Sequence, residues 1–292
     1  MIPKEFDYAA PASLDEALAL LAQHGDEAKI LAGGHSLIPL MKLRLAEPTL
    51  LVDLGRITAL RGIQAEANGE VSIGAMTTYH ALTEASAQGG GLGLLAECAA
   101  QVGDSQVRNR GTLGGSTAHA DPAADLPATL LALNAELEAA GAGGATRRIK
   151  AADFFTGMLT TALEPGEILT YIHLPAGGAQ SGMAYVKLRN KASHYALVGV
   201  AAVVTLGADG KIAQATLGVT GAMATPFRAA AAEAALLGGD PGNGVIDHAA
   251  GLFAGQDGDW MEDLHGSVDY RKHMVEVIAR RAIRLAAQRA RA

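Results

Sequence analysis

The sequence predicts an α+β protein with two parts, an N-terminal domain over residues 1–176 and a smaller sheet-and-helix domain over residues 177–292. Three observations predict this. Short apolar runs are mixed with helical segments in the first part, longer apolar strands precede three helices in the second, and Pro175-Ala-Gly-Gly178 between them is typical of a linker. The chain of 292 residues is long enough to bury two cores, and no internal period indicates repeats.

The first domain begins with a helix whose start is marked in the sequence. Ser13 and Glu16 have the spacing of a capping box, which predicts a helix over residues 14–24 that ends at Gly25. Beyond it, apolar runs predict strands, and amphipathic or proline-started segments predict helices. In chain order we expect strands at 28–32, 49–54 and 71–74, helices at 78–87, 92–100 and 125–133, a hairpin of 135–139 and 146–150, and a last strand at 168–174.

The second domain is predicted to place its strands before its helices. Strands are expected at 183–189, 197–206 and 211–219, the last two joined by the turn Ala208-Asp-Gly210. Helices follow at 226–237, 245–253 and 270–290.

Composition excludes several classes of function. The net charge is −7 and the longest basic cluster is Arg280-Arg281, which argues against nucleic-acid binding. The single cysteine, Cys98, excludes a disulfide framework and an iron–sulfur cluster held by this chain alone, and it is expected to be buried and inert. No apolar run reaches about 18 residues and the N-terminus does not resemble a signal peptide, so we expect a cytoplasmic protein without a transmembrane segment.

Two glycine-paired loops are the most informative feature of the chain. The first is Leu31-Ala-Gly-Gly-His-Ser36, directly after a predicted strand, and the second is Gly111-Thr-Leu-Gly-Gly-Ser116. Paired glycines permit positive φ and allow consecutive N–H groups to point at one anion. Two such loops predict a cradle for a long diphosphate cofactor, and the alternative for the first loop is an ordinary tight turn.

Polar side chains around the second loop extend this hypothesis. Thr112 and Ser116 supply hydroxyls, and the arginines in residues 107–110 are expected either to offset phosphate charge or to pair with acidic neighbours. Asp125 is spaced to accept hydrogen bonds from sugar hydroxyls or a ring N–H, and the alternative is that it caps the helix beginning beside Pro127.

Other motifs fail on their context. Residues 91–96, Gly-Leu-Gly-Leu-Leu-Ala, match a dinucleotide-binding fingerprint, but a polar helical stretch precedes them where a strand is required. Ser116, His119 and Asp121 could suggest a catalytic triad, but the sequence lacks the nucleophile-elbow motif that carries a catalytic serine on a sharp turn. The nine histidines show no metal-ligand spacing with cysteine. The sequence therefore predicts no catalytic residue and no metal site.

Three stretches carry a resemblance to a known family. They are Ala32-Gly-Gly-His-Ser-Leu-Ile-Pro-Leu-Met-Lys-Leu-Arg-Leu-Ala46, Val107-Arg-Asn-Arg-Gly-Thr-Leu-Gly-Gly-Ser-Thr-Ala-His-Ala-Asp-Pro-Ala-Ala-Asp-Leu-Pro127 and Asp263-Leu-His-Gly-Ser-Val-Asp-Tyr-Arg-Lys-His273. The first two resemble the FAD-binding medium subunit of aerobic carbon monoxide dehydrogenase and its molybdenum hydroxylase relatives, and the third resembles that family's C-terminal domain. The family is similar to the flavin domain of xanthine dehydrogenase. The resemblance implies a two-lobed FAD-binding domain of vanillyl-alcohol-oxidase (PCMH) type, with lobes at about 1–55 and 56–176.

The resemblance also implies which residues hold FAD. The first loop would wrap the pyrophosphate, the second would form the other side of the cradle, and Asp125 would bind toward the adenine–ribose half. Tyr195 would cover the isoalloxazine, with a place in the sheet core as the alternative. The predicted FAD-binding residues are Leu31, Ala32, Gly33, Gly34, His35, Ser36, Leu37, Ala75, Thr77, Val102, Gly111, Thr112, Gly114, Gly115, Ser116, Asp125, Leu169, Lys187 and Tyr195. Many relatives carry Gln in place of His35, and because the backbone amide would contact the cofactor there, this departure bears on the substrate rather than on FAD.

The implied function is that of an electron-transfer flavoprotein subunit. A large molybdopterin subunit would oxidise the substrate, and a small subunit with two [2Fe–2S] clusters would pass electrons to FAD, which accepts them singly. The acceptor would be a quinone, a cytochrome or NAD. The resemblance implies a dimer of heterotrimers in the cytoplasm. The partner subunits would be able to bring this complex to the inner face of the membrane. The alternatives are the medium subunit of a related aldehyde, xanthine or N-heterocycle dehydrogenase, a stand-alone flavin oxidase, and a scaffold that has lost FAD.

Overall fold

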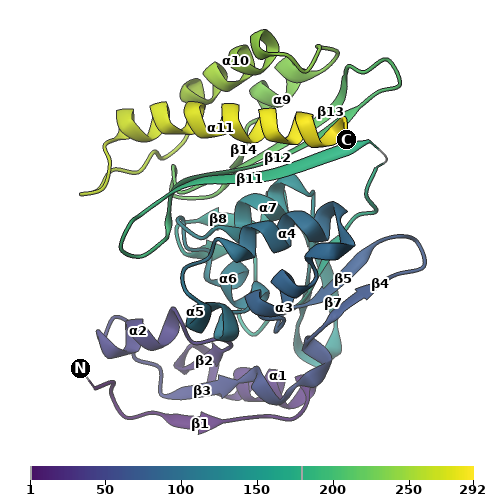
Figure 1. Ribbon diagram of the computed structural model, residues 1–292. Coiled ribbons are helices and arrows are strands. Elements are labelled where there is room, and N and C mark those ends of the chain that lie inside the picture. Colours follow the sequence, from purple (N-terminus) through teal and green to yellow (C-terminus); the bar gives the residue numbers. More distant parts are fainter. Residues whose placement is uncertain (1, 179) are drawn as a thin grey trace.

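The computed structural model describes residues 2–178 and 180–292, and its three main sheets follow one another along the chain. Figure 1 shows an N-terminal lobe (residues 2–55) at the bottom, a helix-rich middle lobe (56–176) and a C-terminal domain at the top. The predicted α+β class is confirmed, because helices cover two larger sheets whose strands all pair antiparallel. The exact limits of the two domains stay a prediction.

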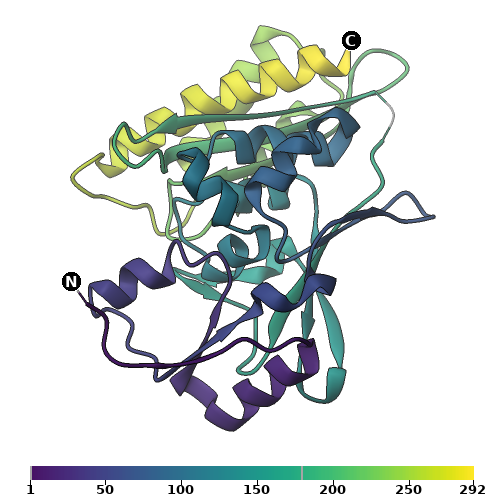
Figure 2. The same cartoon turned by 60° about the horizontal axis from the view of Figure 1, so that its bottom comes forward.

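The N-terminal lobe is a small parallel sheet covered by a helix. The strands lie in the order β1 (Asp7–Ala9), β3 (Leu50–Asp53), β2 (Ala28–Leu31), and the helices are α1 (Leu14–His24) and α2 (Leu37–Lys42). Figure 2 brings this lobe forward, with α1 at the bottom. The Ser13 hydroxyl accepts the Glu16 N–H at 3.2 Å, so the predicted helix start is confirmed, whereas the Glu16 carboxylate accepts the Ala12 N–H instead of that of Ser13.

The middle lobe packs a group of short helices on a five-stranded antiparallel sheet. Its strands lie in the order β4 (Ile63–Ala65), β5 (Val71–Gly74), β10 (Ile168–Leu174), β6 (Glu136–Ala140), β7 (Thr146–Lys150). Its helices are α3 (Tyr79–Glu84), α4 (Gly90–Ala100), α5 (Ser105–Arg110), α6 (Leu113–His119), α7 (Leu126–Ala132) and α8 (Ala151–Phe154), and a small hairpin joins β8 (Phe155–Gly157) to β9 (Thr160–Thr161). The inner face of the sheet and these helices share one core, which contains Ile73, Leu137 and Ile172.

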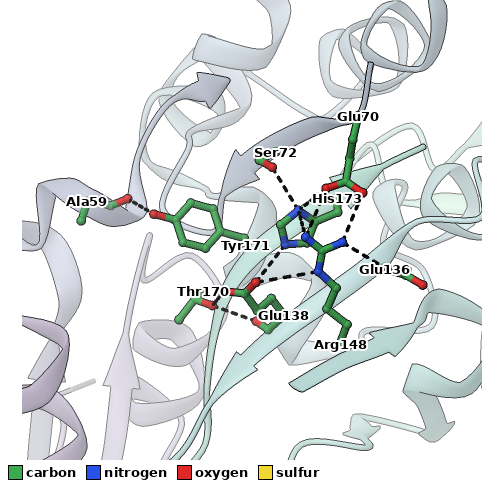
Figure 3. A network of polar contacts seen from close by, with 9 residues as sticks. All are labelled: Ala59, Glu70, Ser72, Glu136, Glu138, Arg148, Thr170, Tyr171 and His173. Atoms are coloured by element: carbon green, nitrogen blue, oxygen red, sulfur yellow. Dashed lines mark hydrogen bonds and ion pairs between the residues drawn. The ribbon is translucent and has the colours of Figure 1, made fainter. Parts of the chain in front are cut away.

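The opposite face of this sheet carries a polar cluster (Figure 3). His173 is 5% exposed, and its Nδ1 lies 3.0 Å from the Ser72 hydroxyl and 3.2 Å from the Glu70 carboxylate. Its Nε2 lies 3.2 Å from the Glu138 carboxylate, and Arg148 pairs with Glu70 at 3.2 Å. Since these residues come from or adjoin β5, β6, β7 and β10, the cluster stabilises the pairing of four strands.

The C-terminal domain is an antiparallel sheet with one long helix across it. Its strands lie in the order β11 (Ser181–Arg189), β12 (Ala196–Leu206), β13 (Ile212–Thr220), β14 (Phe227–Arg228), and its helices are α9 (Ala230–Leu236), α10 (Asn243–Gly251) and α11 (Val268–Ala290). Helix α11 covers one face of β11 and β12, while α4 and α7 of the middle lobe cover the other face (Figure 1). Single-turn 3₁₀ helices occur at Gly25–Glu27, Leu54–Arg56, Thr58–Leu60, Ser86–Gln88, Ala142–Gly144 and Leu252–Gly255.

Gly218 on β13 allows the C-terminal sheet to lie directly on α7. A Cβ at this position would be 2.0 Å from the Ala128 carbonyl oxygen. We expect Gly218→Ala to lower the free energy of unfolding by about 1–3 kcal/mol, the usual cost of overpacking a core. Urea unfolding followed by circular dichroism measures this. Gly244→Ala, in α10 with open space around the new methyl group, should leave stability unchanged or raise it, and equal stability of the two variants would contradict the expectation.

Candidate functional site

A cavity of about 1100 Å³ opens where the N-terminal lobe, the middle lobe and one loop of the C-terminal domain meet. It is larger than the pocket of a typical small ligand, so it can hold a long molecule. The structure brings most of the predicted site residues into its wall. These are Ala32, Gly33, Gly34, His35, Ser36, Leu37, Ala75, Val102, Gly111, Thr112, Gly114, Gly115, Ser116, Asp125, Leu169 and Tyr195, whereas Leu31, Thr77 and Lys187 do not line it.

The first glycine loop lines this cavity and contains backbone N–H groups without a hydrogen-bond partner among the described residues. Within the described part of the chain, the N–H groups of Gly33, Gly34, His35 and Ser36 form no hydrogen bond with protein atoms. Gly34 has a φ of 78°, a left-handed conformation that favours glycine. Half-buried N–H groups in succession around such a residue form an anion-binding concavity. The loop is therefore suited to a phosphate group, and it is more than an ordinary tight turn.

The second glycine segment differs from the prediction, because it is the first turn of helix α6 and not a loop. Thr112 precedes the helix and its side chain accepts the Gly115 N–H at 3.1 Å. Most of the other N–H groups are also used within the protein: Leu113 donates to the Thr77 carbonyl, Gly114 to the Ala75 carbonyl and Ser116 to the Thr112 carbonyl, whereas the Thr112 N–H forms no hydrogen bond with described protein atoms. The segment therefore contributes shape and the Ser116 hydroxyl to the cavity, but not a row of free amides.

The glycines have a second role that the sequence did not reveal, because they let the two segments touch. A Cβ at Gly33 would lie 2.4 Å from the Arg110 carbonyl oxygen and 2.7 Å from the Gly111 Cα. A Cβ at Gly114 would lie 2.4 Å from that of Ala75. Such distances do not occur between real side-chain atoms. The close packing of the two segments thus sets the shape of the cavity wall.

The turn after β5 holds this wall together. Ala75 lines the cavity, and its backbone both accepts the Gly114 N–H and donates to the Thr170 carbonyl. Thr77 instead turns away from the cavity: its hydroxyl donates to the Gly62 carbonyl at 3.1 Å and accepts the Gly62 N–H at 3.0 Å. Of the two residues predicted in this turn, only Ala75 reaches the cavity wall.

Asp125 lines the cavity, but its carboxylate is already bound to protein groups. It is 6% exposed, it accepts the Tyr185 hydroxyl at 2.5 Å, and it pairs with the Lys187 ammonium at 2.8 Å. The capping alternative is wrong, since the side chain accepts no N–H of α7. Burial raises the pKa of Asp125, and the Lys187 ammonium counters this shift. Asp125 and Lys187 form one buried pair, with Lys187 behind the cavity wall.

Tyr195 stands at the mouth of the cavity. It is 44% exposed and lies in the connection between β11 and β12, so the alternative place in the sheet core is wrong. Partial burial raises the pKa of its hydroxyl, as does the nearby Asp121 carboxylate. Val102 and Leu169 supply apolar surface from other sides of the same cavity.

The arginines upstream of α6 do not line the cavity, contrary to the suggested role in offsetting phosphate charge. The Arg108 guanidinium donates to the Val102 carbonyl at 2.9 Å, so it braces the chain at that point. Lining residues that the sequence did not indicate include Tyr79, Asp121 and His194. Tyr79 packs its ring against Gly111, a contact between distant residues that no local pattern signals.

The rejected motifs are explained by their places in the fold. Residues 91–96 lie inside α4, so they form no phosphate-binding turn. Cys98 in the same helix is fully buried, and burial raises the pKa of its thiol, which leaves it unreactive. No cluster of three or more His, Cys, Asp or Glu side chains suited to a metal ion occurs in residues 2–178 and 180–292.

FAD fits this cavity by its chemistry. Its pyrophosphate suits the free N–H groups of the first loop, and the length of the cavity, from α1 to Tyr195, suits a dinucleotide. The flavin supplies the redox chemistry, so the protein has to bind and orient it and needs no general acid or base of its own. Among the helices that the structure describes, none is long and apolar enough to cross a membrane.

Comparison with known proteins identifies both parts of the chain. Residues 4–177 match the model of the FAD binding domain in molybdopterin dehydrogenase, and residues 183–286 match that of the CO dehydrogenase flavoprotein C-terminal domain. The carbon monoxide dehydrogenase medium chain of Afipia carboxidovorans is 41% identical over 291 residues, covering 100% of each chain. The 6-hydroxypseudooxynicotine dehydrogenase complex subunit alpha of Paenarthrobacter nicotinovorans is 38% identical, covering 100% of this chain and 97% of that protein.

A solved structure agrees over nearly the whole molecule. A chain of carbon monoxide dehydrogenase from Hydrogenophaga pseudoflava superposes with a TM-score of 0.94 at 43% identity, covering 99% of each chain. Fold, cavity and sequence therefore agree, and the chain belongs to the family of FAD-binding subunits of the molybdenum hydroxylases, with the C-terminal domain of the carbon monoxide dehydrogenase flavoproteins.

Proposed function

We propose that this chain carries FAD in the large cavity and transfers electrons within a molybdenum hydroxylase complex most like carbon monoxide dehydrogenase. The observation that carries this proposal is the row of unpaired N–H groups from Gly33 to Ser36 in the wall of a cavity of about 1100 Å³. When bound there, the flavin supplies the redox chemistry, so the role proposed for this chain is electron transfer rather than substrate chemistry.

The partners proposed are a large molybdopterin subunit and a small subunit with two [2Fe–2S] clusters, assembled as a dimer of heterotrimers in the cytoplasm. Electrons would enter FAD one at a time from the clusters and leave to a quinone, a cytochrome or NAD. The large subunit would determine the substrate. Relatives of similar identity are subunits of a carbon monoxide dehydrogenase and of a 6-hydroxypseudooxynicotine dehydrogenase complex, so the similarity of this chain supports the class of complex and leaves a related aldehyde, xanthine or N-heterocycle dehydrogenase as the alternative.

The proposed binding site comprises the predicted residues that line the cavity, with the first loop at the pyrophosphate and Tyr195 beside the isoalloxazine. Leu31, Thr77 and Lys187 are proposed to support this wall from behind, because they do not line the cavity. Asp125 lines the cavity and is proposed to hold its wall in place, since the Tyr185 hydroxyl and the Lys187 ammonium bind its two carboxylate oxygens.

Purification of the chain tests the proposal. We expect a yellow protein that releases about one FAD per chain on heating, and whose flavin is reduced by dithionite but not by carbon monoxide, aldehydes or N-heterocycles. Turnover should appear when a molybdenum subunit and an iron–sulfur subunit of such a complex are added. Bound FMN, or no flavin after incubation with excess FAD, would contradict the proposal. Reduction of the flavin by a substrate in the chain alone would favour the stand-alone oxidase.

A further inference from the structure

The geometry points to Lys187 as a positioning residue that holds the connection between β11 and β12 against the FAD cavity, an inference that rests on the proposed FAD-binding function. Its side chain is only 2% exposed and lies outside the cavity wall. Its ammonium group donates to two acceptors, the Asp125 carboxylate and the His194 carbonyl, both at 2.8 Å. Lys187 therefore connects α7 of the middle lobe with a loop of the C-terminal domain.

Asp125 fixes the direction of this ammonium group. Its second carboxylate oxygen accepts the Tyr185 hydroxyl at 2.5 Å, and burial keeps the pKa of that hydroxyl well above its ordinary value, so Tyr185 remains a donor. Tyr185 and Lys187 lie two residues apart on β11, so both point to the same side of the sheet. Both oxygens of the Asp125 carboxylate are thus bound by residues of β11. This arrangement directs the Lys187 ammonium toward the connection between β11 and β12.

The loop, residues 190–195, adopts a backbone conformation that needs such support. The Asn190 side chain accepts the N–H groups of Ala192 and Ser193, which closes the turn. His194 follows with a φ of 61°, a left-handed conformation that is uncommon for residues other than glycine, although histidine adopts it more often than most. The bond from Lys187 reaches the carbonyl of this same residue. The lysine therefore holds the loop at the residue whose backbone is left-handed.

The position of this loop matters to the cavity. Ala192, Ser193, His194 and Tyr195 all line it, and they are the part of the C-terminal domain that does so. On the other side the loop meets Gly103, where a Cβ would lie 2.9 Å from that of His194. If Lys187 is lost, we expect residues 192–195 to leave this position, so that Tyr195 becomes more accessible and FAD dissociates more readily.

A tryptophan probe at the loop tests this in the full chain, with and without FAD. The chain has a single tryptophan, Trp260, so the parent for the experiment carries Trp260→Phe and Tyr195→Trp. Lys187→Met in this parent should increase quenching of the probe by iodide in the FAD-free protein by about threefold or more, since it frees a loop that is otherwise held. It should also weaken FAD binding by about tenfold, equivalent to 1.4 kcal/mol. Lys191→Met, an exposed change in the same loop, should do neither.

A second variant separates positioning from a general loss of stability. Lys187→Met alone leaves the Asp125 carboxylate buried and unpaired, whereas adding Asp125→Asn removes that charge and keeps the contact with Tyr185. We expect the double variant to recover the urea midpoint of the parent but to retain the high iodide quenching and the weak FAD binding. If quenching and FAD binding also return to the parent values, the inference is wrong. If the chain with Tyr195 and Trp260 unchanged binds no FAD, the proposed function fails, while quenching in the FAD-free probe protein still decides the role of Lys187.

Discussion

We expect Gly33→Ala to weaken FAD binding by this chain about tenfold to a hundredfold, as is typical of overpacking at a rigid contact. The new methyl group would lie 2.4 Å from the Arg110 carbonyl oxygen, and backbone atoms cannot move aside as the end of a flexible side chain can. The first loop would have to separate from the Arg110–Gly111 backbone. That movement would carry the free N–H groups of Gly34, His35 and Ser36 away from the position where they face a phosphate.

The measurement is the ratio of flavin to protein after gel filtration, followed by titration of the apoprotein with FAD. Gly93→Ala is the matched control, because Gly93 lies in α4 and its new methyl group would be 3.8 Å from its nearest neighbour. Circular dichroism should show that both variants are folded. A Gly33→Ala chain that retains FAD like the parent would show that the contact between the two segments does not shape the site.

Elements with a continuous apolar pattern could be predicted from the sequence, and their predicted bounds agree closely with the observed bounds. The strands predicted at 71–74 and 168–174 have these bounds in the structure, because β5 and β10 lie inside the middle-lobe sheet and bury side chains in its core. The helix predicted at 14–24 also has these bounds, since its capping residue and the glycine after it mark both ends. Several missed elements lack such marks; for example, β1 is three residues long, and α2 carries Pro39.

The second glycine segment shows why the site was predicted only in part. Gly114 and Gly115 favour a loop by their intrinsic propensity, yet they lie in α6 because Thr112 caps the helix and Gly114 packs against Ala75. That packing joins residues 39 positions apart, and the Asp125–Lys187 pair joins residues 62 positions apart. Local patterns carry no information on contacts of this kind. The sequence therefore indicated which residues gather at the cavity better than it indicated what each side chain does there.

Arg271 is the residue of the segment from Asp263 to His273 that makes the most buried contacts. We expect substitution of Arg271 to have the largest effect on the stability of the chain. Its side chain is 3% exposed, and one guanidinium nitrogen donates to the carbonyls of Leu197 and Gly221. A second nitrogen pairs with the Asp263 carboxylate at 2.7 Å. Arg271 thus joins the start of α11 to the start of β12 and to the turn after β13.

The turn at Gly221 is hydrogen-bonded to a segment of the cavity wall. Gly221 donates its N–H to the Pro122 carbonyl at 2.8 Å, and the neighbouring Thr220 hydroxyl donates to the carbonyls of Pro122 and Ala124. Pro122 stands between Asp121 and Ala124, which both line the cavity. Because the contacts run from Arg271 through this turn to residues 121–124, we expect a loosened turn to weaken FAD binding as well as the C-terminal domain.

We expect Arg271→Met to lower the free energy of unfolding by about 3–5 kcal/mol, because it leaves the buried Gly221 carbonyl and the half-buried Leu197 carbonyl without this donor. Arg271→Lys should recover only part of this loss, since an ammonium group cannot reproduce the fork that reaches the Leu197 and Gly221 carbonyls and the Asp263 carboxylate together. Urea unfolding gives the free energies. Lys272→Met is the control: its ammonium lies 5.3 Å from the Trp260 ring, a contact that contributes about 0.5–1 kcal/mol at an exposed site. If Arg271→Met and Lys272→Met unfold at the same urea concentration, the buried guanidinium is not what holds the C-terminal domain to the cavity wall.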